Sequence, residues 1–88
     1  MSYPLFVIGD LADLVTGTAV TPSDKARAAR AFFTQRAGRE SFWVEHVGMV
    51  RHVLELLDLF AVDTAALLDE VTKVANDRVR VHLLALAN

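Results

Sequence analysis

A long segment with apolar side chains at helical spacing, residues 40–60, constrains this sequence more than any other feature. One stripe repeats at intervals of four and three residues: Trp43, Val47, Val50, Leu54 and Leu57. This spacing places side chains on one face of an α-helix. A second stripe lies beside the first: Phe42, Met49, Val53, Leu56 and Phe60. Because the apolar face is so wide, we expect this helix to be packed on two sides, at the centre of the fold or against a second copy.

The flanking sequence predicts further helices. One begins at Ser23 or Asp24, where a short polar side chain can accept from the free N–H groups of the first turn, and stops at Gly38. Asp63 is predicted to cap another helix, whose inward residues are Leu67, Leu68, Val71, Val74 and Ala75. A break is expected at Asn76-Asp77. We therefore predict one mostly α-helical domain over residues 1–88, an all-α bundle of about four helices.

Three short segments leave an alternative fold open. Residues 5–9 form an apolar run that fits either a buried strand or the first turn of a helix. Residues 41–44 have strand propensity, so that the long helix would start only at Glu45 or His46. Residues 78–82 alternate like a short strand, unless a helix runs through to Leu86. The alternative is an α/β fold with a small parallel sheet of strands near 5–9, 41–45 and 79–82.

The apolar content predicts a protein partner. Hydrophobic residues make up 53% of the chain, which excludes a disordered protein. A domain of 88 residues has little interior in which to bury so much apolar surface. We expect the excess to lie at an interface, with self-association as a homodimer, and we predict that the interface includes Phe42, Trp43, Met49, Val53, Leu56 and Phe60.

The sequence contains no cysteine, which excludes disulfides and thiolate zinc sites and favours a reducing compartment. The first ten residues have no basic segment, and their apolar run is too short for a signal peptide. The longest uncharged stretches are also too short to span a membrane. These features predict a cytoplasmic protein with no membrane association.

Charge is distributed unevenly, although the net charge of −2 argues against nucleic acid as the main partner. The basic residues gather in one segment: Lys25, Arg27, Arg30, Arg36 and Arg39. The acidic residues gather in a later one: Glu55, Asp58, Asp63, Asp69 and Glu70. Either these are two solvated helix faces, or a basic face meets an acidic one within the fold or across a dimer.

Few residues suggest catalysis or metal binding. The histidines His46, His52 and His82 lack the spacing of three or four that places two metal ligands on one helix face, so we predict no metal site. The remaining catalytic candidates are the carboxylates of Asp10, Asp13 and Glu45, which could hold Mg²⁺ through oxygen. The alternative roles are a helix cap for Asp10 and a solvated acid for Glu45. We expect no cofactor outside the magnesium of this alternative.

The order of segments also resembles part of a known family. An apolar run ends in an acid at Asp10, an Ala/Arg-rich helix follows at residues 26–33, and Phe42-Trp43-Val44 leads into a helix at residues 47–57. This order, continued by a helix at residues 65–75, resembles the N-terminal two-thirds of a PIN domain, the fold of VapC-type ribonuclease toxins. The resemblance implies an α/β fold and a magnesium-dependent ribonuclease in which Asp10 is catalytic.

The sequence departs from the PIN pattern at three places. The family's Asp-Thr-Asn-like signature reads Gly9-Asp10-Leu11-Ala12, and Arg51 stands where the family has a helical Glu. The third acid of the family has no counterpart before Asn88. If the chain descends from this family, we therefore expect nuclease activity to be lost.

Three functional hypotheses follow. The first is a small, non-catalytic, homodimeric protein–protein interaction domain, of the kind found among phage or toxin–antitoxin accessory proteins. The second is a Mg²⁺-dependent PIN-like ribonuclease that uses Asp10, with Asp13 and Glu45. The third is a nucleic-acid-binding module that uses the basic helix at residues 25–39, and it lacks a base-reading pattern beside the basic residues.

Overall fold

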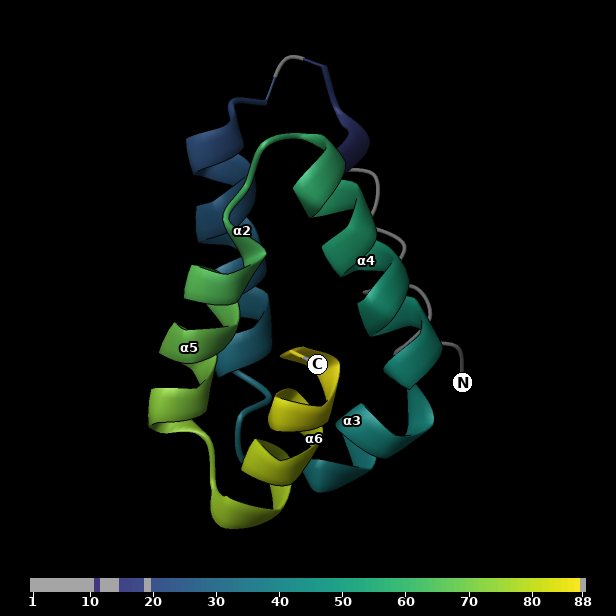
Figure 1. Cartoon of the computed structure of the whole chain (residues 1–88), viewed down its shortest axis with the longest axis vertical. Coiled ribbons are helices and arrows are strands. Elements are labelled where there is room, and N and C mark those ends of the chain that lie inside the picture. Colours follow the sequence, from purple (N-terminus) through teal and green to yellow (C-terminus); the bar gives the residue numbers. More distant parts are fainter. Residues whose placement is uncertain (1–10, 12–14, 19, 88) are drawn as a thin grey trace.

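The structure, a computed structural model, describes residues 11, 15–18 and 20–87 of the chain. Five helices lie wholly within these ranges: α2 (Pro22–Thr34), α3 (Glu40–Glu45), α4 (Val47–Leu59), α5 (Thr64–Val74) and α6 (Asp77–Ala87) (Figure 1). No residue in the same ranges belongs to a β-strand. The prediction of an all-α bundle is confirmed.

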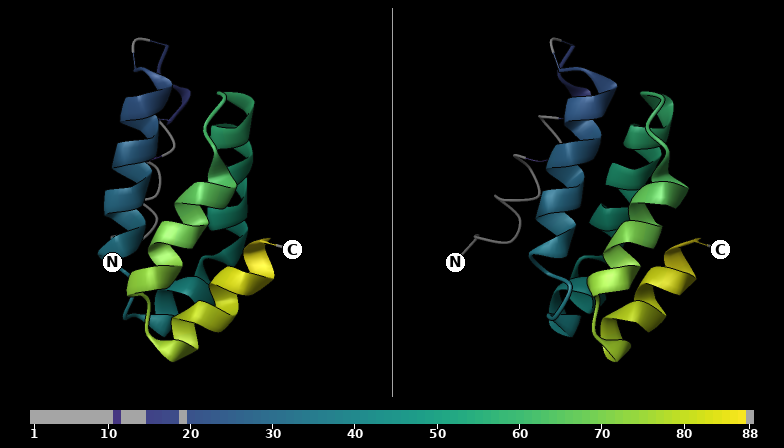
Figure 2. Two further views of the ribbon diagram at one scale, coloured as in Figure 1. Left: turned by 60° about the vertical axis from the view of Figure 1, so that its left-hand side comes forward. Right: turned by 90° about the vertical axis from the view of Figure 1, so that its left-hand side faces the viewer.

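The helices form a bundle that is closed at one end by α3 and α6. Helices α2 and α5 lie side by side and run in the same direction, whereas α4 runs in the opposite direction. The short α3 leads directly into α4, and α6 packs against both α5 and α3. Figure 2 shows α6 at the edge of the bundle, with one of its sides turned away from the other helices.

The core is continuous and is centred on an aromatic cluster. The side chains of Phe33 and Trp43 are almost completely buried, with their ring centroids 5.5 Å apart. The rings of Phe42 and Trp43 are nearly perpendicular, with their centroids 5.3 Å apart. Aliphatic residues from α4, α5 and α6 complete the core, among them Leu57, Val71 and Leu83. Aromatic pairs of this geometry add to the free energy gained by burying their surface.

Three successive carbonyl groups in the turn between α2 and α3 accept hydrogen bonds from other parts of the chain. The indole Nε1 of Trp43 donates to the carbonyl of Arg36 at 2.9 Å. The backbone N–H of Asn76 donates to the carbonyl of Ala37 at 3.1 Å, and its side-chain Nδ2 donates to the carbonyl of Gly38 at 3.2 Å. We call the carbonyls of Arg36, Ala37 and Gly38 the carbonyl turn. It connects α3 and the start of α6 to the end of α2.

The same Asn76 begins α6. Its Oδ1 accepts a hydrogen bond at 2.9 Å from the backbone N–H of Val79, as an N-cap side chain does. The guanidinium of Arg80 donates to the carbonyls of Thr72 and Ala75 at the end of α5. The predicted break at Asn76-Asp77 is therefore confirmed. At this corner, side chains bind some of the free backbone groups at the end of α5 and at the start of α6.

The predicted helix needs a correction at each of its ends, because α2 ends at Thr34 and not at Gly38, and its start also differs. Helix α2 is capped by Thr21, whose Oγ1 accepts from the N–H of Asp24, and not by Ser23 or Asp24. Pro22 is the first residue of α2, a position that suits proline because its missing N–H would have no partner there. The cap at Asp63 is confirmed, since its Oδ1 accepts from the N–H of Ala66. Val74, predicted to face inward, is 61% exposed at the end of α5.

The predicted long helix at residues 40–60 is two helices. The chain bends at His46, whose φ and ψ of −118° and 24° separate α3 from α4. The bend lets Trp43 reach the carbonyl of Arg36 while α4 continues along the core. Helical spacing alone does not reveal this bend, because the apolar stripes continue on both sides of it.

The α/β alternative is wrong at two of its three strands. Residues 41–45 belong to α3 and residues 79–82 to α6. In α6 the buried residues are Val79 and Leu83, four positions apart, whereas Val81 is exposed. These residues form a helix and not a strand because a helix lets Val79 and Leu83 fill the core beside α5 and α3. The third proposed strand, residues 5–9, lies outside the described residues.

The end of α4 contains a backbone conformation that is unusual for its residue type. Ala61 has a φ of 65°, in the left-handed region that glycine adopts most readily. The N–H of Val62 donates to the carbonyl of Leu57, and the N–H of Ala61 donates to that of Asp58. This is the Schellman arrangement that ends many helices. The side chain of Val62 is buried directly after it.

We expect Ala61→Gly to stabilise the protein. Glycine removes the clash of Cβ in the left-handed region, and part of this gain is lost to the greater freedom of glycine in the unfolded chain. The free energy of unfolding should rise by about 0.5–1 kcal/mol, measured by urea denaturation. The control is Ala31→Gly at an exposed position within α2, which should lower it by about 1 kcal/mol. Equal destabilisation by both variants would contradict the role of Ala61.

Substitutions of Asn76 should separate its two side-chain bonds. Asn76→Ala removes the cap of α6 and the bond to Gly38, and should lower the free energy of unfolding by about 1–2 kcal/mol. Asn76→Asp keeps the accepting oxygen near the helix N-terminus and removes only the donor. It should therefore lower the free energy of unfolding clearly less than Asn76→Ala does. Urea denaturation of the two variants tests this order. If Asp destabilises as much as Ala, the bond to Gly38 matters more than the cap.

Candidate functional site

Of the three predicted catalytic acids, only Glu45 belongs to the described residues. Asp10 and Asp13 lie outside them, so the ribonuclease hypothesis stays a prediction. Glu45 is exposed at the end of α3, and Arg51 is exposed one turn into α4. Within the described ranges no group of three or more acidic or histidine side chains is placed to hold a metal ion.

The three histidines occupy different environments. The His46 ring packs against Phe42 at the bend, with centroids 5.3 Å apart, and His52 is exposed on α4. His82 Nε2 lies 3.4 Å from a carboxylate oxygen of Glu40. The second oxygen of Glu40 lies 3.6 Å from the guanidinium of Arg78, so Glu40 joins α3 to α6 through two side chains. This role of Glu40 is not predicted from the sequence, because Arg78 and His82 are distant from it along the chain.

Half of the predicted interface is core. Phe42, Trp43 and Val53 are buried by the chain itself, which corrects their expected position on a binding surface. Phe42 and Trp43 are buried because their rings pack against Phe32 and Phe33 of α2, a contact that the helical pattern does not specify. Val53 lies on the side of α4 that faces the core. Met49, Leu56 and Phe60 are partly buried against the core, and their contact with a partner stays a prediction.

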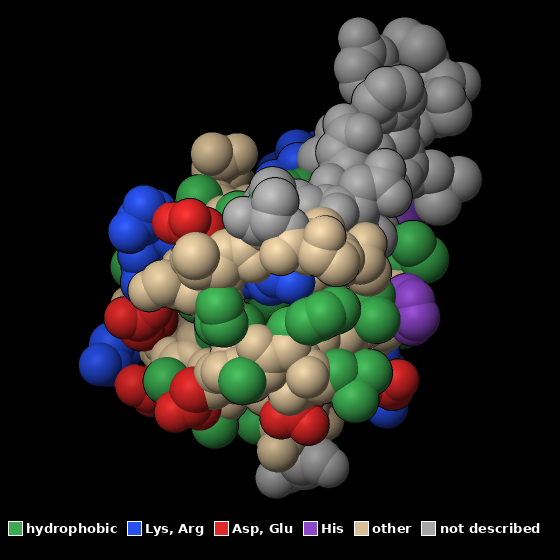
Figure 3. Space-filling model, turned by 90° about the horizontal axis from the view of Figure 1, so that it is seen from above, with side chains coloured by type: hydrophobic (Ala, Val, Ile, Leu, Met, Phe, Trp, Pro, Cys, Tyr) green, Lys and Arg blue, Asp and Glu red, His purple; other side chains and the backbone are tan. Residues whose placement is uncertain are grey.

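The predicted basic face is divided into separate contacts. Arg27 pairs with Asp24 at 3.4 Å, and Arg30 pairs with Glu70 on α5 at 3.3 Å. The second pair is a contact between the basic and the acidic segment within the fold. Figure 3 shows positive and negative side chains intermingled on the side of the molecule that α2 and α5 form. The described part of α2 therefore presents paired charges and no continuous cationic surface.

The other two arginines of the basic segment also differ. The Arg36 guanidinium lies 3.7 Å from the centre of the Phe32 ring and donates to the Phe32 carbonyl. Burial, and secondly the charge of Arg39, lower the pKa of Arg36 from its usual value. Arg39 is exposed and has no ion pair among the described residues.

Lys25 differs most from its predicted place on a basic surface. Its side chain is only 2% exposed, and its ammonium group lies 3.5 Å from the centre of the Phe60 ring. The face of an aromatic ring attracts a cation, and the carbonyl end of α4 favours a positive charge in the same place. Lys25 thus connects α2 to the end of α4. No periodic pattern marks it, because Phe60 is distant in sequence.

A groove of about 430 Å³ lies between the first halves of α2 and α5. Its apolar lining comes from small side chains such as Ala26 and Ala66, and the pair of Arg30 and Glu70 also lines it. The charged residues of the groove are already engaged, because Asp63 caps α5 and Glu70 binds Arg30. We therefore assign no ligand to this groove.

The outer face of α6 is the candidate functional surface. Val79 and Leu83 face the core, whereas Val81 and Leu84, on the opposite side, are 65% and 55% exposed. Arg78 lies one turn before Val81 and Ala85 one turn after it, and both are exposed, so these four residues form one stripe. The acidic Asp77, 96% exposed, lies beside Arg78 at the start of this face. We call Arg78, Val81, Leu84 and Ala85 the outer α6 stripe. The sequence analysis missed it because residues 78–82 fitted a strand as well as a helix.

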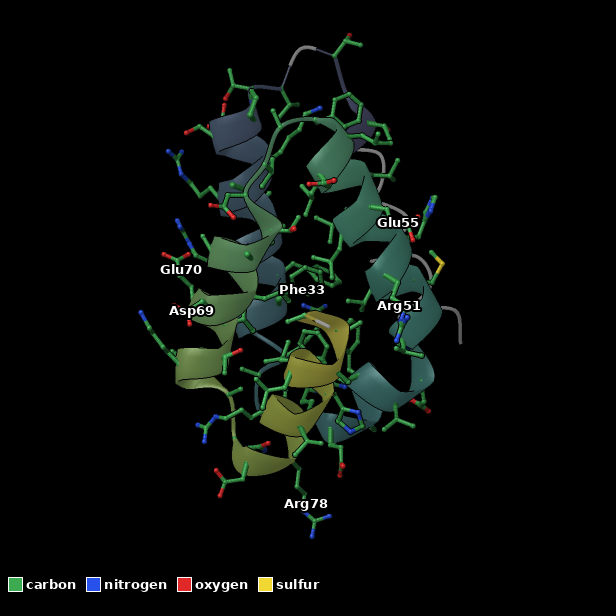
Figure 4. All side chains as sticks on the ribbon, viewed as in Figure 1. Phe33, Arg51, Glu55, Asp69, Glu70 and Arg78 are labelled. Atoms are coloured by element: carbon green, nitrogen blue, oxygen red, sulfur yellow. The ribbon has the colours of Figure 1, made fainter. Side chains whose placement is uncertain are left out.

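The acidic side chains of α4 and α5 lie away from one another. Figure 4 shows Glu55 and Arg51 on α4 and, on the other side of the molecule, Asp69 and Glu70 on α5. Asp69 pairs with Lys73 on its own helix. The predicted acidic segment therefore forms two separate surfaces, one on α4 and one on α5.

Comparison of the chain with protein-family models, curated proteins and solved structures finds no match. None of the helices in the described ranges is both long and apolar enough to pass through a lipid bilayer. The candidate surface therefore rests on the geometry of this chain alone.

The contact between Lys25 and Phe60 should be measurable by a double-mutant cycle. We expect Lys25→Met and Phe60→Leu to show a coupling free energy of about 0.5–2 kcal/mol, because each single change removes the same contact. Chemical denaturation of the wild type, both single variants and the double variant gives this value. A coupling of zero would mean that Lys25 is held by packing alone.

Proposed function

We propose that this chain is a non-catalytic protein–protein interaction domain that binds its partner through the outer α6 stripe. The observation that supports this proposal is the presence of apolar side chains on both faces of α6. The inner face supplies Val79 and Leu83 to the core, and the outer face exposes Val81 and Leu84 to water. Burying exposed apolar surface yields about 25 cal/mol per Å², so a partner that covers both side chains gains free energy.

The other exposed apolar residues make weaker candidates. Leu59 is 78% exposed, but it follows the acidic Asp58 and has no exposed apolar neighbour one turn earlier, where Glu55 lies. Val44 and Val47 lie on either side of the bend at His46, on different helices. Single exposed apolar residues are common on soluble proteins, whereas adjacent ones on one helix face are typical of binding surfaces.

The position of α6 is well determined before any partner binds. Asn76 caps its first turn and bonds the carbonyl turn, while Arg80 bonds the end of α5. Glu40 contacts Arg78 and His82 from α3. A surface that is already ordered loses less conformational entropy on binding, which favours affinity.

The test is a capture experiment with matched variants. We would immobilise the full chain and present a second, differently tagged copy of it together with an extract of the source cells. We expect the wild type to retain a protein that Leu84→Glu does not retain, because a buried carboxylate without a partner is costly. A loss of at least about tenfold in retained protein is expected for removal of a central contact.

The control is Leu59→Glu, which places the same charge at an exposed apolar position outside the outer α6 stripe. It should retain as much protein as the wild type. Circular dichroism should show the same helix content in all three proteins, since both leucines are exposed. The proposal is wrong if the wild type and Leu84→Glu retain equal amounts of the second copy and of every other protein.

A further inference from the structure

We draw no further inference here: the strongest candidate, the outer α6 stripe, is an exposed and largely apolar helix face that the proposed function already uses, and nothing in the structure shows what covers it.

Discussion

The fold depends on one turn whose three successive carbonyl groups accept hydrogen bonds from the nearby α3 and from the distant start of α6. The indole N–H of Trp43 and two N–H groups of Asn76 donate to the carbonyls of Arg36, Ala37 and Gly38. Trp43 is buried, and an indole N–H in that position requires an acceptor. The carbonyl turn thus fixes where the aromatic cluster forms and where α6 begins. The placement of the outer α6 stripe, and of the surface proposed for binding, follows from this turn.

Local signals predicted those parts of the fold that depend on local chemistry. The cap at Asp63, the inward residues Leu67 and Val71, and the break at Asn76 all follow from residues within one or two helical turns. The bend at His46 depends instead on the contact of Trp43 with the carbonyl turn, and a continuous apolar stripe carries no sign of it. The apolar stripes of residues 40–60 predicted helical structure correctly, but they did not predict the change of direction at His46.

The candidate surfaces were harder to predict because side chains of one type serve different purposes. Lys25 and Arg27 look alike in the sequence, yet the first is buried over Phe60 and the second pairs with Asp24 at the surface. The excess of apolar residues predicts a shared surface but does not give its position, and the shared surface stays a prediction. Phe42 and Val53 are needed by the chain's own core, which leaves Val81 and Leu84 uncovered. Which residues remain exposed is decided by tertiary packing.

The bonds between Asn76 and the carbonyl turn also bear on the order in which the chain folds. The donor and acceptor of the Asn76–Gly38 bond are 38 residues apart, so a long loop must close before the bond can form. Closing such a loop costs chain entropy before any contact offsets it, and contacts between distant residues generally slow folding. The bend between α3 and α4 depends on the bond from Trp43 to the carbonyl of Arg36, only seven residues away, and can form earlier. We therefore expect α6 to dock late, so that the surface proposed for binding exists only once the rest of the domain is assembled.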